Sequence, residues 1–342
     1  MSLVLMGAAA SGVVGKLAEK FTDYLTDLVR GQDQAVQQKA TENAAAFLGE
    51  LSKQISRIEQ RGTPFSDSQI EQALRDPDVA ITIRTALAGA ARTSSQEKHD
   101  ALARAVAERL GAAAESNEAL ASVIAADAIP KLSVVHLRFL GIAAVVFTVR
   151  PLSSLYSGLP ANGHLDAEQI RERYDSYTSW LKTSLERLHT GVTLDELQIA
   201  HLVSAGCLTY ERKLLRDLTA VLTPKRSAFL DPRATWHVGI DIGEFLNFDP
   251  TGRDLGSLWE YGLQHVTLTP AGRLIGAAVH ESVGGDAVDL NWARAESPQD
   301  QAIDDAVWDG RTIREEFLRA LDRAVRDRAE RRVRPWISLA KE

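Results

Sequence analysis

Apolar residues recur at steps of three and four positions along most of the first 150 residues. The first such stripe runs from Val13 to Val29, with charged side chains between its apolar positions. This spacing places the apolar side chains on one face of an α-helix. Asp76-Pro77 is typical of a helix start, with the aspartate as N-cap. We therefore predict a helical bundle over residues 1–150, with further stripes at residues 47–58, 79–87, 102–110, 120–124 and 137–147.

The stretch from Pro151 to Gly163 contains two Pro, two Gly and three Ser, a composition typical of a linker. We predict a domain boundary there. After it, the expected order of helix, turn, helix, strand and helix is that of a winged helix-turn-helix. We therefore predict a mainly α protein, in which a winged-helix-like domain with a small β wing (residues 164–310) follows the bundle. This domain carries an insertion at about 225–260, and an Arg-rich C-terminal helix occupies residues 311–342. The expected elements of the winged-helix-like domain are helices at 193–205, 210–221 and 271–280 and a strand at 264–268.

Charge is unevenly distributed along the chain. Residues 151–310 hold 13 Lys and Arg against 23 Asp and Glu, a net charge of −10, whereas residues 311–342 hold 10 against 6, a net charge of +4. An acidic surface repels phosphate groups, which argues against a broad nucleic-acid interface on the second domain. The lone Cys207 allows no intrachain disulfide, and the apolar opening residues lack a preceding basic segment. We therefore expect a cytoplasmic protein.

Basic residues are the candidates for binding nucleic acid. A winged helix that reads DNA needs such residues on its second helix, which enters the major groove. In this chain Glu211 and Asp217 offset them, so we favour a protein contact over a nucleic-acid contact. The end of the tail is a second candidate, either for nucleic acid or for the acidic region of a neighbouring subunit. The candidate residues are Arg212, Lys213 and Arg216 on the second helix, and Arg328, Arg331, Arg332 and Arg334 in the tail.

Three enzymatic interpretations were weighed against structural ones. Arg92 and His99 fit the Arg-x4–6-His spacing of HEPN ribonucleases, but Thr93-Ser94-Ser95 between them is typical of a helix break. His237, Asp241 and Glu244 have the chemistry of metal ligands, yet glycines interrupt the segment and a loop network is favoured. Cys207 has no fixed basic neighbour in sequence and is expected in the core. We therefore expect no catalytic residue, metal or cofactor.

Three segments resemble a known family. Thr267-Leu268-Thr269-Pro270-Ala271-Gly272-Arg273-Leu274 is similar to the closing motif of Abi-alpha, a bacterial family associated with abortive infection. The segment from Asn117 to Phe147 resembles the middle of that family, and residues 25–30 (Leu-Thr-Asp-Leu-Val-Arg) resemble its opening. The resemblance implies a role in phage defence and brings no catalytic residues.

The expected function is a non-enzymatic interaction module that forms homo-oligomers and binds protein partners. The first alternative is a winged-helix DNA-binding regulator, and the second is a HEPN-type ribonuclease. The N-terminal amphipathic helix offers a further contact, with a partner helix or with a membrane surface. Its polar face mixes Lys16 and Lys20 with Glu19, Asp23 and Asp27, so packing or oligomerisation is favoured over membrane binding.

Overall fold

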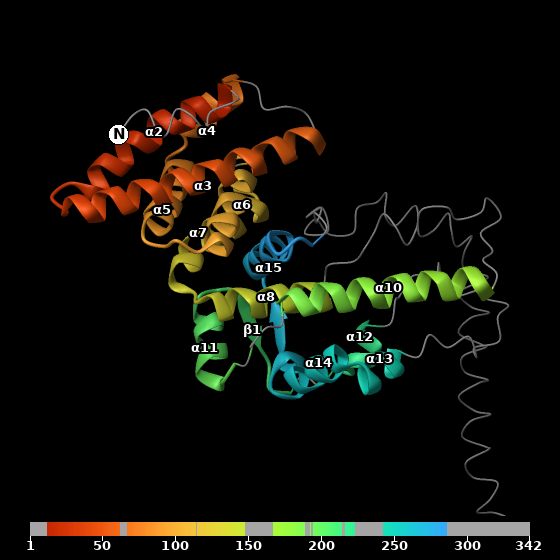
Figure 1. The fold of residues 1–342 in the computed structure, drawn as a ribbon. Coiled ribbons are helices and arrows are strands. Elements are labelled where there is room, and N and C mark those ends of the chain that lie inside the picture. The colour runs from red at the N-terminus through yellow and green to blue at the C-terminus, as the bar shows by residue number, and fades with distance from the viewer. Residues whose placement is uncertain are drawn as a thin grey trace, which may run out of the picture. The chain divides into compact units, whose positions relative to one another are not determined.

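The structure, a computed structural model, describes residues 12–61, 67–113, 115–147, 167–188, 192, 194–213, 216–222 and 242–285. These residues form helices and one two-stranded sheet (Figure 1). The prediction of a mainly α protein is confirmed. None of the helices in the described ranges combines the length and the apolar character needed to cross a bilayer.

The first half of the chain is helical, as the apolar stripes predicted. Their largest members, among them Phe21, Phe47 and Leu51, are fully buried, so the stripes do face a common core. Asp76 caps its helix as expected, accepting a hydrogen bond from the Asp78 amide. The elements are α2 (Gly12–Val29), α3 (Gln34–Arg61), α4 (Asp67–Arg75), α5 (Pro77–Ala91), α6 (Gln96–Gly111), α7 (Asn117–Ala128), η1 (Ile129–Lys131) and α8 (Val134–Phe147).

The second half contains short helices around a small sheet. In that sheet β1 pairs with β2 in antiparallel orientation, with Leu208 opposite Leu268. The elements are α10 (Ala167–Leu188), α11 (Glu196–Ser204), β1 (Leu208–Tyr210), α12 (Leu218–Leu222), α13 (Ile242–Phe248), α14 (Pro250–Glu260), η3 (Leu263–His265), β2 (Val266–Leu268) and α15 (Pro270–Ser282).

Of the strand predicted at 264–268, Val266–Leu268 is confirmed as β2, while Leu263–His265 forms the 3-10 helix η3; the predicted helix over 210–221 is wrong. Its first residue, Tyr210, ends β1, Arg212 and Lys213 form a turn, and among the described residues of the segment the helix begins at Leu218. The reason is a long-range backbone pairing that the local helix propensity could not reveal. The Glu211 amide donates to the His265 carbonyl and so extends the β1–β2 ladder. The segment taken as an insertion contains α13 and α14.

The chain divides into two compact units. One comprises Met1–Leu152, Ser176–Thr223 and Asp241–Ala293, and the other Ser153–Asp175, Pro224–Ile240 and Arg294–Glu342. In the second unit the described residues are 167–175, which begin α10. In the first unit α15 packs against α8, α6 and α7 (Figure 1). Helices from both sides of the predicted boundary therefore share one core, and the boundaries of the units differ from those predicted.

Glycine permits the closest approach in that core. A Cβ atom at Gly276 of α15 would overlap the carbonyl oxygen of Leu140 on α8 and lie 2.7 Å from the Cβ of Ala144. A Cβ at Gly272 would likewise overlap the Cys207 carbonyl oxygen. The backbone of α15 thus touches its neighbours directly, which only residues without a side chain allow.

Candidate functional site

Arg216, a candidate for nucleic-acid binding, is engaged inside the protein. Its guanidinium lies 4.3 Å from the centre of the Phe147 ring and 5.8 Å from that of Trp259. Its Nε donates to the Gln264 carbonyl at 3.3 Å, and its Nη2 donates to the Val266 carbonyl. Burial lowers the pKa of Arg216. This side chain ties the end of α8 to β2 and is not aimed at an external phosphate.

Arg212 and Lys213 are exposed in the turn after β1. Glu211 and Asp217, also exposed, lie close to them in the chain, so acidic side chains offset the basic ones in this turn. The other predicted contacts, in the tail, lie outside the described residues: Arg328, Arg331, Arg332 and Arg334.

His99 and Arg92, the pair that fits the HEPN spacing, fasten the turn between α5 and α6. The His99 ring is buried, and its Nε2 lies 2.9 Å from the Thr93 carbonyl oxygen and 3.2 Å from the Ala90 carbonyl oxygen. Both partners are acceptors, so Nε2 carries a proton and donates. Arg92 is the C-cap of α5 and is exposed. In this arrangement the imidazole holds a loop closed.

Cys207 is fully buried, and burial raises the pKa of its thiol to about 12. A thiol with such a pKa is protonated at neutral pH and is a poor nucleophile. Of the suggested metal ligands, His237 and Asp241 lie outside the described residues, as does the side chain of Glu244. Within the described part of the chain, no three His, Cys, Asp or Glu side chains converge as a metal site would require.

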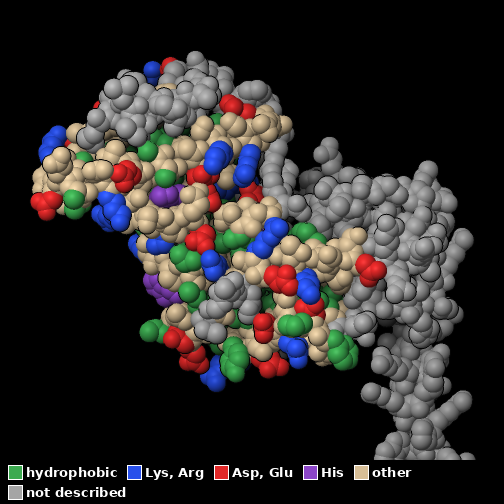
Figure 2. All heavy atoms as spheres, viewed as in Figure 1, with side chains coloured by type: hydrophobic (Ala, Val, Ile, Leu, Met, Phe, Trp, Pro, Cys, Tyr) green, Lys and Arg blue, Asp and Glu red, His purple; other side chains and the backbone are tan. Residues whose placement is uncertain are grey.

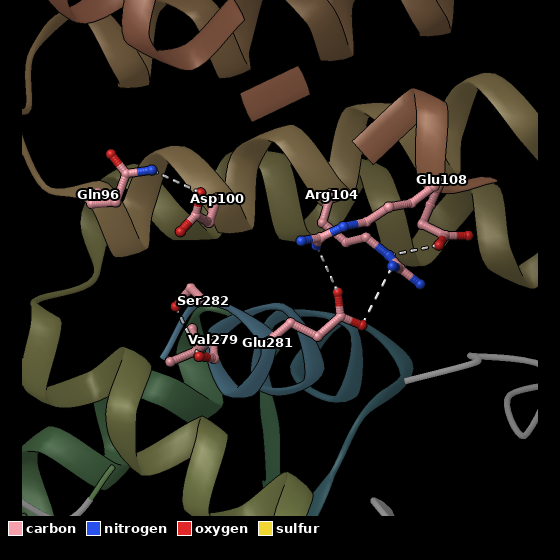
Figure 3. Close-up of polar contacts among 8 residues, drawn as sticks. Gln96, Asp100, Arg104, Glu108, Val279, Glu281 and Ser282 are labelled. Atoms are coloured by element: carbon pink, nitrogen blue, oxygen red, sulfur yellow. Dashed lines mark hydrogen bonds and ion pairs between the residues drawn. The ribbon is translucent and has the colours of Figure 1, made fainter. Parts of the chain in front are cut away.

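Four side chains form a charged cluster that the sequence did not reveal: Arg57 of α3, Arg104 and Glu108 of α6, and Glu281 of α15. Glu281 reaches from α15 toward Arg104 (Figure 3), whose Nη1 lies 3.5 Å from its carboxylate. The Nη1 of Arg57 lies 3.4 Å from the same carboxylate. Arg104 Nε lies 2.7 Å from Glu108 Oε1. The side chains of Arg104 and Glu281 are each 3% exposed, while that of Arg57 is 45% exposed. The cluster therefore joins α6 to α15 through two buried charges, Arg104 and Glu281, and joins α3 to them through the partly exposed Arg57.

A second group of charges lies one turn before Arg104 on α6, where Asp100 pairs with a carboxyl group of α3. Asp100 accepts a hydrogen bond from Gln96 Nε2 at 3.0 Å (Figure 3) and faces Glu50 of α3, which binds Lys53 at 2.7 Å. Burial and the Glu50 charge raise the pKa of Asp100 to about 7. Burial alone would raise the pKa of Glu50, but hydrogen bonds from Lys53 and Asp100 bring it below its usual value. Between the lowered pKa of Glu50 and about pH 7, the two carboxyl groups therefore hold one proton, which resides on Asp100.

This pair predicts that Asp100→Asn is more stable than the wild type above pH 7 and equally stable near pH 4. A raised pKa means that the folded protein binds the proton more tightly than the unfolded chain. The resulting stabilisation is complete below the unfolded pKa of 3.8 and is lost as the pH rises through about 7. Asparagine donates to Glu50 without titrating, so we expect a gain on the order of 1 kcal/mol at pH 8. Urea unfolding at several pH values measures it.

The matched control for this prediction is Asp127→Asn, which alters an exposed carboxylate that pairs with Lys131. Its effect should be small at every pH. A stability difference between Asp100→Asn and wild type that stays constant from pH 4 to pH 8 would contradict the shared proton.

Exposed apolar side chains concentrate in one part of the second half. We call this the 195–261 surface. Leu197, Phe248 and Tyr261 are 78–79% exposed, and Tyr210 is 47% exposed. Figure 2 shows hydrophobic side chains interspersed with acidic and basic ones along the lower edge, where α11, α13 and α14 lie in Figure 1. The exposed charged residues of this surface are Asp195, Glu196, Glu211, Arg212, Lys213, Asp217, Arg253, Asp254 and Glu260.

The two sides of this surface are joined by direct contacts. Tyr210 and His265 pack edge to face, with ring centres 5.9 Å apart. Gly262, which follows Tyr261, comes so close to Ile199 of α11 that a Cβ would lie 2.7 Å from the Ile199 Cδ1. The end of α14 thus lies beside α11, and the exposed Tyr261 and Leu197 belong to adjoining elements.

Comparisons with known proteins give one finding. A family model matches residues 16–230, which is more than half of the chain, and the function of that family is unknown. Neither a curated protein nor a solved structure matches the chain significantly.

Proposed function

The chain belongs to this family of unknown function, and we propose that it is a non-enzymatic interaction module that assembles with further copies of itself. The observation that carries the proposal is the 195–261 surface, where four large apolar side chains stand exposed among charges of both signs. By contrast, two side chains with catalytic chemistry, His99 and Cys207, are buried, and the His99 ring bonds to the backbone of its own turn.

The composition of the surface fits a protein interface. Tyrosine and other large apolar groups supply most of the binding energy at such interfaces when they become desolvated. The same surface carries exposed charges of both signs, such as Glu196 and Arg212. In a dimer with two-fold symmetry, an acidic residue of one chain can then face a basic residue of the other. These features support contact between identical chains.

We expect the wild-type protein to show a mass above that of one 37.3 kDa chain in light scattering after size exclusion. The double variant Leu197→Lys, Tyr261→Lys should shift the mass toward one chain, because each lysine places a charge where an apolar contact would be desolvated. Both side chains are exposed, so folding should be unaffected. Removal of residues 311–342 should also reduce the number of chains in each assembly, since the basic tail complements the acidic region of a neighbouring chain.

The matched control is Leu120→Lys, because Leu120 is also an exposed leucine but lies on α7, outside the 195–261 surface. It should assemble like the wild type. A wild-type protein that stays at the mass of one chain at tens of micromolar concentration contradicts the proposal.

The winged-helix-like arrangement of the second half is part of this proposal. The β1–β2 pair, followed directly by α15, supports it, with the two strands as a minimal wing. The same arrangement underlies the DNA-binding alternative, in which the exposed Arg212 and Lys213 would contact phosphates. Salt-dependent retention on duplex DNA that is lost in Arg212→Glu, Lys213→Glu would favour that alternative over self-assembly.

The cellular role proposed for the assembly is defence of a bacterial host against phage. The support is the resemblance of residues 267–274 and of Asn117–Phe147 to the Abi-alpha family. Expression of the wild type should lower the plating efficiency of phage, and the Leu197→Lys, Tyr261→Lys variant should lose this effect. Equal plating with and without the wild type, tested over a panel of phages, would count against the role.

A further inference from the structure

Helix α8 begins with a capping box that contains a histidine. Ser133 Oγ accepts a hydrogen bond from the His136 amide at 3.2 Å, and the Ser133 amide donates to His136 Nδ1 at 3.2 Å. In the usual capping box the residue at this third helical position is Glu or Gln, whose side-chain oxygen accepts from the cap amide. Here an imidazole nitrogen takes the place of that oxygen, so the cap depends on the charge state of the ring.

The hydrogen bond defines that charge state. Nδ1 accepts a hydrogen bond from the Ser133 N–H, so it carries no proton itself, and the ring is neutral with its proton on Nε2. His136 is only 8% exposed, and among the described residues Nε2 has no hydrogen-bond partner. A second proton on this ring would occupy Nδ1 and remove the acceptor on which the Ser133 amide depends.

A second imidazole faces the first from another element. The ring of His201 on α11 lies 5.3 Å from that of His136, centre to centre, at an angle of 44°. His201 is exposed, and its Nε2 lies 3.4 Å from the Lys131 carbonyl oxygen of η1. Figure 1 shows α11 beside the start of α8. The two histidines therefore lie at the contact between these helices.

The charged groups around the pair do not offset a positive charge on His136 fully. Lys131 Nζ is bound to Asp127 at 2.6 Å, and Arg138 of α8 is bound to Glu97 at 2.9 Å. The carboxylate of Asp195, at the start of α11, attracts a proton to His136, but burial and the neighbouring His201 act against it and together lower the pKa of His136. The folded protein thus disfavours the doubly protonated ring.

We propose that His136 and His201 form a pH-sensitive clasp that holds α11 against the start of α8 at neutral pH and opens in mild acid. Protonation of His136 at Nδ1 breaks the bond from the Ser133 amide and places a positive charge on a ring whose centre lies 5.3 Å from that of His201. Because the pKa of His136 is lowered in the folded state, the stabilisation is present above the unfolded pKa of 6.5 and is lost as the pH falls below it.

The test is amide hydrogen exchange on the full chain at pH 7.5 and pH 5.5, corrected for the intrinsic dependence of exchange on pH. In the wild type, exchange in residues 134–140 and 195–206 should rise several-fold at the lower pH. His136→Gln is the decisive variant, because glutamine completes the capping box and does not titrate. Its exchange in these segments should be the same at both pH values. His136→Ala, which lacks the acceptor, should exchange rapidly at both.

Two controls separate the clasp from a general effect of acid. His265→Gln, a histidine on η3, should keep the wild-type response, and exchange in α3 should stay constant in every variant. A wild type whose two segments are equally protected at both pH values overturns the clasp. So does a His136→Gln variant that responds to pH like the wild type.

Discussion

Replacing Glu281 with alanine should destabilise the folded protein by about 3 kcal/mol. Glu281 is the only acidic residue from α15 in the charged cluster described above, and it contacts both Arg104 and Arg57. Its removal leaves the guanidinium of Arg104, 3% exposed, with Glu108 as its remaining partner in the cluster. A buried charge that loses a partner cannot recover its hydration, which is why the cost exceeds that of a surface ion pair. Urea unfolding at pH 7.5 measures the loss.

The control is Arg57→Ala, which removes the other side of the same carboxylate. Its side chain is 45% exposed, so water replaces much of what the ion pair provided, and the loss should stay below about 1 kcal/mol. Similar small losses for Glu281→Ala and Arg57→Ala would mean that the cluster is hydrated in solution and does not tie α15 to α6.

Gly276→Ala should destabilise the protein by about 3 kcal/mol, near the upper end of the range for overpacking. The added methyl would overlap the backbone carbonyl of Leu140, which cannot turn aside as a side chain could, so α8 and α15 would have to separate. That separation would open the core shared by the two halves of the described chain. Thermal and urea unfolding measure the effect.

The matched control is Gly256→Ala on α14, where a Cβ would meet no atom within 4 Å. Alanine restricts the unfolded chain and favours helix, so this variant should gain about 0.5–1 kcal/mol. Opposite signs for the two variants are the expected result. A neutral Gly276→Ala would show that α8 and α15 are not in backbone contact.

The helices of the first half could be predicted because their signals are local. A period of three to four apolar residues and a cap such as Asp76-Pro77 act within a few turns, and the structure confirms both. The start of β1 could not be predicted in this way. A segment of three residues carries little strand propensity of its own. The strand exists because Leu208–Tyr210 pairs with Val266–Leu268, which lie far along the chain.

The candidate sites show the same difference between what is local in sequence and what depends on tertiary contacts. Sequence identified Arg212, Lys213 and Arg216 as basic, but only the packing shows that Arg216 binds Phe147 and two carbonyls while the other two stay exposed. The clasp was missed because its two histidines, His136 and His201, belong to different helices. A weak signal was present in Ser133-x-x-His136, which has the spacing of a capping box but an unusual residue at its end.

The order of residues alone therefore determined where most helices lie, that the protein is mainly α, and that charge is segregated between its regions. The tertiary structure decided which of its charges are buried, which glycines touch backbone, and which helices share a core. The physical reason is range: helix periodicity and capping act between residues a few positions apart, whereas the contact of Glu281 with Arg104 joins positions 177 residues apart. A short window of sequence, such as one helix and its caps, never contains both partners.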